Sequence, residues 1–397
     1  MMLAKRWTVG VVACLALFGP FTVDRALAKF SATTKATGTW AAAANFSEGT
    51  LRAWGLNGSG QLGLGDNINR TAPVQVGAVA TWVKVAVGGR FSCGVRSDGT
   101  LWCWGLNGSG QLGLGDTTNR TIPVQVGAAT TWAWVTAGDQ QTCATRTNGT
   151  LWCWGLNGSG QLGLGDNINR SSPVQVGAAT TWAAPAAGAN HTCAIRTSGT
   201  LWCWGLNGSG QLGLGDNINR SSPVQVGTAT SWATLAAGGR HTCAISTAGM
   251  LWCWGLNGSG QLGLGDTTNR TIPVQVGAAT TWASVTAGDQ HTCATRTAGT
   301  LWCWGLNGSG QLGLGDNTNR TTPVQVGAAT DWLSATGGLA HTCGRRTGKS
   351  VWCWGGDNNG QLGLGDNIDR NVPTQITGFR AQVVTTGSQA QHTLAVV

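Results

Sequence analysis

The chain has 397 residues, of which 64 are glycine and 22 are tryptophan, while only 10% are charged. Such a chain is not intrinsically disordered, because disorder requires low hydrophobicity and a high net charge. The formal net charge of +9 is mild for this length, and the arginines are spread along the chain instead of clustered. The composition therefore predicts no basic groove for nucleic acid.

Residues 1–28 have the pattern of a secretory signal peptide: a basic pair, an apolar run and the small-residue motif Ala26-Leu27-Ala28. We therefore expect a mature chain of residues 29–397 in a secreted, periplasmic or cell-surface location. Cys14 leaves lipid attachment open as an alternative. The apolar run is too short to span a membrane, and no other segment is suited to do so.

A repeat with a period of 50 residues occupies most of the chain. The string WGLNGSGQLGLGD begins at Trp54, Trp104, Trp154, Trp204, Trp254 and Trp304, and a diverged seventh copy begins at Trp354. Units of this size cannot each bury a core alone, so they indicate one closed or stacked array. We expect residues 29–397 to form a single domain.

Each repeat contains four short β-like runs separated by turn residues, and none has a helical period. One unit has the runs Trp232–Leu235, His241–Ile245, Leu251–Trp254 and Pro223–Val226. This pattern predicts an all-β fold, a seven-bladed β-propeller of four-stranded blades. The Leu251–Trp254 run is bulky on both faces, as expected for a blade between two neighbours. Most tryptophans should therefore pack between blades.

Apart from Cys14, the cysteines form pairs with nine residues between them. In each pair a turn such as Thr197-Ser198-Gly199 places the two cysteines opposite each other in a hairpin, within reach of a disulfide. Zinc is the competing interpretation, but the chain has no C-x-x-C motif. In the first repeat both positions are alanine, Ala43 and Ala53. The predicted disulfides are Cys93–Cys103, Cys143–Cys153, Cys193–Cys203, Cys243–Cys253, Cys293–Cys303 and Cys343–Cys353.

The two ends of the chain suggest how the ring closes. Residues His392–Val397 repeat the HTCAI strand, with Leu394 in the place of its cysteine. The nearest available hairpin partner is Leu51–Trp54, which contains Ala53 and also lacks its cysteine. We expect these two segments to pair in the first blade. A weak repeat copy at residues 40–45 competes for the same place.

The recurring string GxxHTCAIRTSGTLWCWGLNGSGQLGLGD resembles the repeat of the regulator of chromosome condensation family. The resemblance covers nearly all of residues 29–397 and implies a seven-bladed propeller. Members of that family range over nucleotide exchange, light sensing and protein inhibition, so the fold alone leaves the function open. The even spacing leaves no room for the protruding loop of the nucleotide-exchange members. The tryptophans of the light sensor's GWRHT motifs are replaced by Ala189, Gly239, Asp289 and Leu339.

Other recurring motifs have structural explanations. Gly58–Gly63 matches the dinucleotide-binding pattern, but no helix follows, so its glycines should form turns. Asp66 and Arg70 recur together and should make a local ion pair. The recurring histidines should hydrogen-bond within the fold: His191, His241, His291 and His341. No catalytic constellation stands out, and we expect no enzyme activity, no cofactor and no metal.

The repeats differ most between their TW and TC anchors. Loops on a rigid scaffold commonly carry recognition, although drift at unconstrained positions explains the variation equally well. The candidate partner-binding face is formed by Arg90, Gln140, Asn190, Arg240, Gln290 and Leu339. We therefore expect a monomeric, non-enzymatic extracytoplasmic scaffold for an unidentified protein partner. A nucleotide-exchange-type regulator of a small GTPase is the alternative, and a surface-structural or glycan-binding protein is a third.

Overall fold

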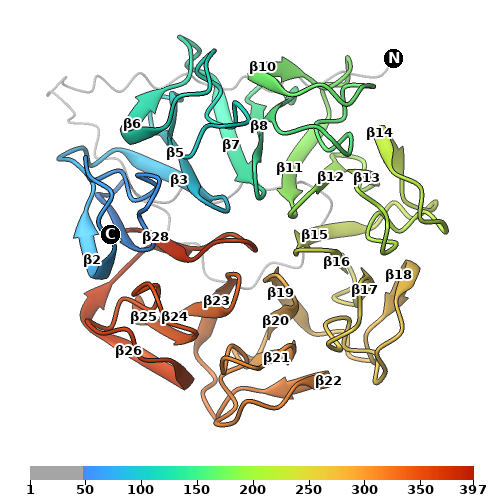
Figure 1. Ribbon diagram of the computed structural model, residues 1–397. Coiled ribbons are helices and arrows are strands. Elements are labelled where there is room, and N and C mark those ends of the chain that lie inside the picture. Colours follow the sequence, from blue (N-terminus) through green and yellow to red (C-terminus); the bar gives the residue numbers. More distant parts are fainter. Residues whose placement is uncertain (1–47) are drawn as a thin grey trace, which may run out of the picture. The chain divides into compact units, whose positions relative to one another are not determined.

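Seven four-stranded antiparallel sheets surround a central channel, as Figure 1 shows. The computed structural model describes residues 48–397, and these residues form no helix. The predicted all-β propeller of four-stranded blades is therefore confirmed. The predicted leader and the weak repeat copy at residues 40–45 lie outside the described residues. Within residues 48–397 there is no helix long and apolar enough to cross a membrane.

The strands occupy equivalent positions in every blade. The first, innermost strands are β27 (Val383–Thr385), β3 (Trp82–Val87), β7 (Trp132–Ala137), β11 (Trp182–Ala187), β15 (Trp232–Ala237), β19 (Trp282–Ala287) and β23 (Trp332–Gly337). The second strands are β28 (His392–Val396), β4 (Phe91–Arg96), β8 (Gln141–Arg146), β12 (His191–Arg196), β16 (His241–Ser246), β20 (His291–Arg296) and β24 (His341–Arg346). The third strands are β1 (Leu51–Gly55), β5 (Leu101–Gly105), β9 (Leu151–Gly155), β13 (Leu201–Gly205), β17 (Leu251–Gly255), β21 (Leu301–Gly305) and β25 (Ser350–Gly355). The outer strands are β2 (Arg70–Gln75), β6 (Arg120–Gln125), β10 (Arg170–Gln175), β14 (Arg220–Gln225), β18 (Arg270–Gln275), β22 (Arg320–Gln325) and β26 (Arg370–Arg380). Blades 1 to 7 are numbered in the order of these lists.

Blade 1 is assembled from both ends of the described chain. Its strand order is β2-β1-β28-β27, so the N-terminal strands β1 and β2 complete a sheet begun by the C-terminal strands. The antiparallel pairing of β1 with β28 places Ala53 opposite Leu394. The segments at the two ends of the described chain are therefore paired within one blade. The ring is held shut by main-chain hydrogen bonds between residues that are far apart in sequence.

The hairpin between the second and third strands has the predicted geometry. Gly199 has a φ of 76°, a conformation that glycine adopts without a Cβ clash, and its N–H donates to the Arg196 carbonyl at 2.8 Å. This turn sets the register that places Cys193 directly opposite Cys203. All six predicted disulfides are present, with Cα separations of 4.1–4.2 Å.

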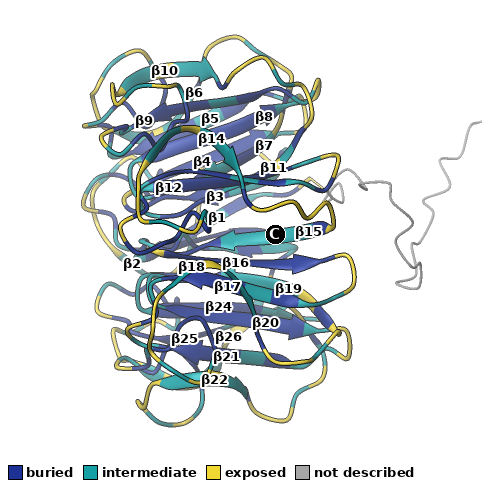
Figure 2. Ribbon diagram, turned by 90° about the vertical axis from the view of Figure 1, so that its right-hand side faces the viewer, coloured by how far each residue is buried: buried dark blue, intermediate teal, exposed yellow. Residues whose placement is uncertain are grey.

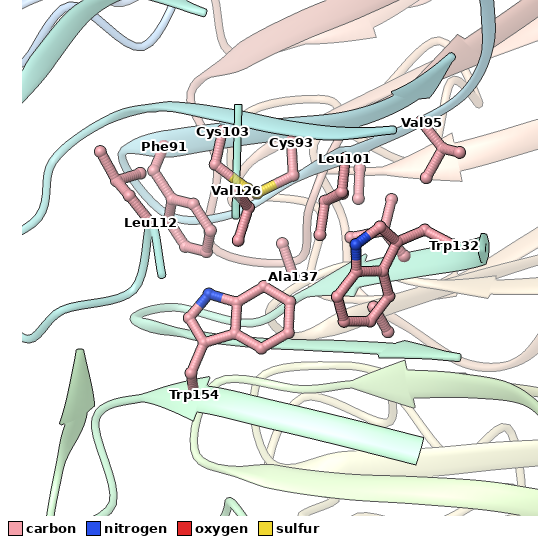
Figure 3. Close-up of a cluster of buried hydrophobic side chains, with 13 residues drawn as sticks. Phe91, Cys93, Val95, Leu101, Cys103, Leu112, Val126, Trp132, Ala137 and Trp154 are labelled. Atoms are coloured by element: carbon pink, nitrogen blue, oxygen red, sulfur yellow. A yellow bond between two sulfur atoms is a disulfide. The ribbon is translucent and has the colours of Figure 1, made fainter. Parts of the chain in front are cut away.

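The core lies between blades and is filled by tryptophan, as predicted. Trp154 of blade 3 packs with Leu112 and the Cys93–Cys103 disulfide of blade 2 (Figure 3). Its indole N–H donates to the Gln111 carbonyl of blade 2 at 3.0 Å. A Cβ on Gly113 would lie 2.6 Å from that nitrogen, so only glycine fits there. The side view in Figure 2 shows that the strands are largely buried, while the exposed residues gather in the loops at their ends.

Candidate functional site

Seven turns that join the first and second strands surround one mouth of the central channel. We call them the mouth turns: residues 88–90, 138–140, 188–190, 238–240, 288–290, 338–340 and 386–391. Their backbones are linked from blade to blade by N–H···O=C hydrogen bonds of 3.0–3.3 Å. The links run from Gly89 to Gly138, Asp139 to Ala189, Ala189 to Gly238, Gly239 to Gly288, Asp289 to Gly338 and Leu339 to Ala390. Six junctions between blades are thus fixed by main-chain contacts.

The structure brings all six candidate residues together on this face. Arg90 and Arg240 are exposed, whereas Gln140, Asn190, Gln290 and Leu339 are half-buried. The polar residues of the second group contact the long loop between the third and outer strands of the preceding blade. Ser109 Oγ donates to Gln140 Oε1 at 2.9 Å, Ser259 Oγ donates to Gln290 Oε1 at 3.2 Å, and Gln161 Nε2 donates to Asn190 Oδ1 at 3.3 Å. The face therefore combines two exposed arginines with three hydrogen-bonded polar side chains and the half-buried Leu339.

Sequence reasoning missed the seventh mouth turn. Thr336 Oγ1 bonds to Thr386 across a spacing of 50 residues, but His341 and the corresponding His392 are 51 residues apart. The turn at 386–391 thus contains one extra residue, which breaks the repeat. Its Gln389 Nε2 donates to Asp289 Oδ1 at 2.8 Å. The aligned HTLAV and HTCAI strings carried the signal for this insertion.

Asp139 and Asp289 add negative charge to the mouth turns. Burial raises the pKa of Asp139, while the nearby Arg90 acts in the opposite direction and the Asp289 carboxylate raises it further. The two aspartates belong to blades 3 and 6, so their charges act on each other from separate parts of the ring. The mouth therefore presents acidic and basic groups side by side, and its charge pattern differs from blade to blade.

The channel behind the mouth is lined mainly by apolar groups, with several threonines among them, and has a volume of about 400 Å³. Its walls are the innermost strands, with side chains such as Val85, Leu235 and Val285. Lys84 is the ionisable residue on these strands, and its ammonium lies 5.0 Å from the centre of the Trp134 ring. Burial lowers the pKa of Lys84 to about 8. A channel of this composition supplies no pair of acid and base for catalysis.

The recurring histidines hydrogen-bond within the fold, as predicted, and the structure shows that their partners lie in the neighbouring blade. Thr242 Oγ1 of blade 5 donates its hydrogen to the Gln211 carbonyl at 2.9 Å. His191 of blade 4 must therefore donate its Nε2–H to Thr242 Oγ1, at 3.0 Å. The same contact joins four further pairs: His241 and Thr292, His291 and Thr342, His341 and Thr393, and His392 and Ser92. The histidines are structural and do not converge on one metal.

The recurring Asp–Arg pairs are local, again as predicted. Asp66 accepts from Arg70 Nη2 at 2.6 Å, and its pKa is lowered by the Ile68 N–H first and by Arg70 second. Asn57 Nδ2 donates to the carbonyl and to Oδ1 of Asp66, both at 3.0 Å. The long glycine-rich loop is thus folded on itself. Within residues 48–397, no group of three or more His, Cys, Asp or Glu side chains is arranged to hold a metal ion.

Blade 7 departs from this loop, because Asp357 stands where the other blades have asparagine. Its Oδ1 accepts from the Leu362 N–H at 2.9 Å, as in the other blades. Oδ2 takes the place of the amide nitrogen but has no hydrogen-bond partner. Asp357 is fully buried, and this burial, with the charge of Asp366 adding to it, raises the pKa of Asp357 to about 7.

We expect Asp357→Asn to stabilise the propeller by about 4 kcal/mol at pH 8, because ionisation of a buried carboxyl is unfavourable by about 1.4 kcal/mol per pKa unit. The folded pKa lies above the unfolded value of 3.8, so stability is lost as the pH rises from 3.8 to 7. Urea unfolding at pH 8 and pH 6 measures the difference, which should be about 1 kcal/mol smaller at pH 6. The matched control Asn57→Asp should destabilise at pH 8. Equal stability of Asp357→Asn and the parent at pH 8 would contradict this account.

The family assignment rests on a comparison with family models. The RCC1-like domain model matches residues 19–292 and, in a second match, residues 180–397. The chain belongs to the RCC1-like domain family. The family resemblance inferred from the repeat is thereby confirmed, and the mouth turns are those of an RCC1-like propeller. No curated protein matches the chain significantly in sequence.

Solved RCC1-like structures share the fold. Human WBSCR16 is 22% identical, with a TM-score of 0.80 over 88% of this chain and 98% of its own. Prp20p from Saccharomyces cerevisiae, studied for its binding to Gsp1p and histones, is 21% identical, with a TM-score of 0.79 over 88% and 91%. Yeast RCC1 (Prp20) bound to Kap60 is 19% identical, with a TM-score of 0.81 over 95% and 97%. These identities relate the proteins by fold.

Proposed function

We propose that the mouth turns of this RCC1-like propeller bind a protein partner and that the protein is a non-enzymatic, extracytoplasmic scaffold. The observation that carries this proposal is the set of six side chains, of four different types, on one hydrogen-bonded backbone ring. A rigid backbone lowers the entropy lost on binding, and variation between blades gives such a surface specificity. Prp20p, which shares the fold, is described as binding proteins, which supports a protein partner.

The proposed location outside the cytoplasm has two independent supports. Six disulfides are favoured in an oxidising compartment, and residues 1–28 have the pattern of a cleaved leader. Mass spectrometry of the protein from its native source tests both supports at once. We expect a chain that begins near Lys29 with its paired cysteines oxidised. An intact N-terminus with free thiols would instead favour the nucleotide-exchange alternative.

The binding surface is tested by photocrosslinking. A photoreactive residue at Arg90 or Arg240 should crosslink one recurrent protein in secreted or surface fractions. The matched control places the same residue at Asn148 or Ser198, in turns at the opposite ends of the second strands. Alanine at the six candidate positions should then weaken binding of the purified partner at least tenfold, because interface arginines and their neighbours dominate binding energy. Equal crosslinking from both sets of turns would reject the mouth turns as the binding surface.

A further inference from the structure

Five blades hold an arginine between two indole rings at the end of the second strand. In blade 3 the Arg146 guanidinium lies 4.7 Å from the centre of the Trp132 ring and 4.1 Å from that of Trp152. In blade 4 Arg196 lies 4.5 Å from Trp182 and 4.0 Å from Trp202. The equivalent arginines of blades 2, 6 and 7 are Arg96, Arg296 and Arg346. Stacking on both faces fixes a guanidinium in position and leaves its edge for hydrogen bonding.

Two of these arginines line grooves between neighbouring blades, near the outer strands. The groove at Arg146 has a volume of about 420 Å³, and that at Arg196 has about 480 Å³. The walls of the first combine small apolar side chains, among them Leu114, Ala129 and Pro173, with the polar Gln125 and Ser172. In each groove the stacked arginine therefore lies beside small apolar side chains, in a space large enough for a small organic group.

Blade 7 shows which chemical group pairs with the stacked arginine. Asp331 Oδ1 lies 3.6 Å from Arg346 Nε. The residues at the equivalent position of blades 3 and 4 are Thr131 and Thr181, and the backbone there is the same. The Asp331 carbonyl accepts from Thr347 N–H at 2.9 Å, and the Thr131 carbonyl accepts from Thr147 N–H at 2.8 Å. The chain therefore supplies a carboxylate to the stack in blade 7 and a neutral hydroxyl in blades 3 and 4.

The grooves of blades 3 and 4 retain donors without acceptors. Among residues 48–397, no ion pair involves Arg146 or Arg196. The arginine Nε has no hydrogen-bond partner in blades 3, 4 and 7 alike, and the same holds for the Nε1 of Trp132, Trp182 and Trp332. Blades 3 and 4 differ from blade 7 because they lack the nearby carboxylate that Asp331 supplies. Buried donors without acceptors are unfavourable, so an acceptor that reaches the groove gains from their proximity.

We propose that the grooves at Arg146 and Arg196 are binding sites for a carboxylate carried on a small apolar group. The guanidinium pairs with the carboxylate, as Arg346 does with Asp331, and the apolar group packs on the small side chains of the wall. The carboxylate belongs either to a free organic acid or to an acidic residue in a peptide. These sites are separate from the mouth turns and do not depend on the proposed function.

The test uses 4-phenylbutyrate as the free acid and a blocked Leu-Asp-Leu peptide as the second source, with ligand-observed NMR as the readout. The neutral controls are 4-phenylbutyramide and the Leu-Asn-Leu peptide. We expect at least one acid to bind at least tenfold more tightly than its amide. Binding of the free acid, of the peptide or of both supports the sites and identifies the source. Binding of neither, or equal binding of acid and amide, overturns the proposal.

Variants of the chain complete the test. Thr131→Asp with Thr181→Asp copies the arrangement of blade 7 and should weaken binding at least tenfold by occupying both arginines. Ser231→Asp is the matched control, because it adds the same charge in blade 5, where Ser246 replaces the arginine. Ser246→Arg should add a site and raise the number of bound ligands. Far-UV circular dichroism checks that each variant is folded. Undiminished binding to the Thr131→Asp, Thr181→Asp protein would overturn the proposal.

Discussion

Acidification from pH 7 to pH 5 is expected to destabilise the propeller strongly, through the five histidines between the blades. Burial lowers the pKa of His191 and His291 to about 4, and that of His241, His341 and His392 to about 3. Mutual repulsion adds to the effect, since His241 lies near His191 and His291. Each side chain is fully buried, so protonation requires the contact between blades to open.

The direction follows from proton linkage. In the unfolded chain the histidines bind protons below pH 6.5, whereas in the folded chain His191 does so only below about pH 4. The contribution of these histidines to stability is therefore complete above pH 6.5 and is lost as the pH falls. At pH 5 each histidine contributes a loss of about 2 kcal/mol, at 1.36 kcal/mol per pKa unit. Five such losses approach the whole stability of a typical domain, which is about 5–15 kcal/mol. The lowered aspartate pKa values act only below pH 3.8.

The chain offers its own replacement for these histidines. Gln141 occupies the same position in blade 3, and its Nε2 donates to the Gly188 carbonyl of blade 4 at 2.9 Å. We expect His191→Gln with His241→Gln to recover about 4 kcal/mol at pH 5 and to leave stability at pH 8 nearly unchanged. Gln141→His should lower the stability at pH 5, because it adds one more buried histidine. Urea unfolding at the two pH values measures these changes.

The same histidine variants can be measured in a protein that also carries Asp357→Asn, which removes the opposing effect of Asp357 on the pH dependence of stability. Asp357 has a raised pKa, so it gains stability over part of the same pH range in which the histidines lose it. In that background the dependence on pH between 7 and 5 should come from the histidines. A parent protein and a double glutamine variant with the same midpoint at pH 5 would show that the histidines are not the acid-sensitive contacts.

Much of the fold could be predicted because the same pattern of strands and turns recurs in every 50-residue repeat. The period fixed the number of blades, and the paired cysteines fixed the hairpin register, since Cys193 can meet Cys203 only in one alignment. Contacts between blades were harder to predict. Arg146 and Trp152 meet across strands, and neither residue type indicates a stack by itself. The inserted residue before His392 was hidden because it breaks the period. Asp357 was visible as a substitution, but its meaning required the burial of its side chain and the lack of a partner for Oδ2.

A seventh disulfide at the ring closure is expected to stabilise the propeller more than any of the existing six. Ala53 and Leu394 are directly opposed in the register that the cysteine pairs occupy in the other blades. A bond there would close nearly the entire described chain into one loop, whereas each natural bond joins residues 10 apart. The chain-entropy model gives about 5 kcal/mol for the long loop and about 3 kcal/mol for the short one.

The gain is reduced by the loss of the Leu394 side chain, which is fully buried beside Leu51 and Trp82. The volume of two cysteines is slightly smaller than that of alanine plus leucine, which removes about 1 kcal/mol. We therefore expect Ala53→Cys with Leu394→Cys to raise the free energy of unfolding by about 4 kcal/mol in the oxidised protein. Urea unfolding measures this change, and peptide mapping confirms the bond.

The matched control is Cys193→Ala with Cys203→Ala, which removes one short loop and should lower stability by about 3 kcal/mol. The comparison separates two pictures of the ring. If unfolding begins where β1 leaves β28, the seventh bond slows unfolding far more than the loss of a bond in blade 4 accelerates it. If the blades unfold independently of the closure, the new bond forms but the unfolding rate stays unchanged. The first result would identify blade 1 as the weakest point of the ring, because it alone is closed without a covalent link.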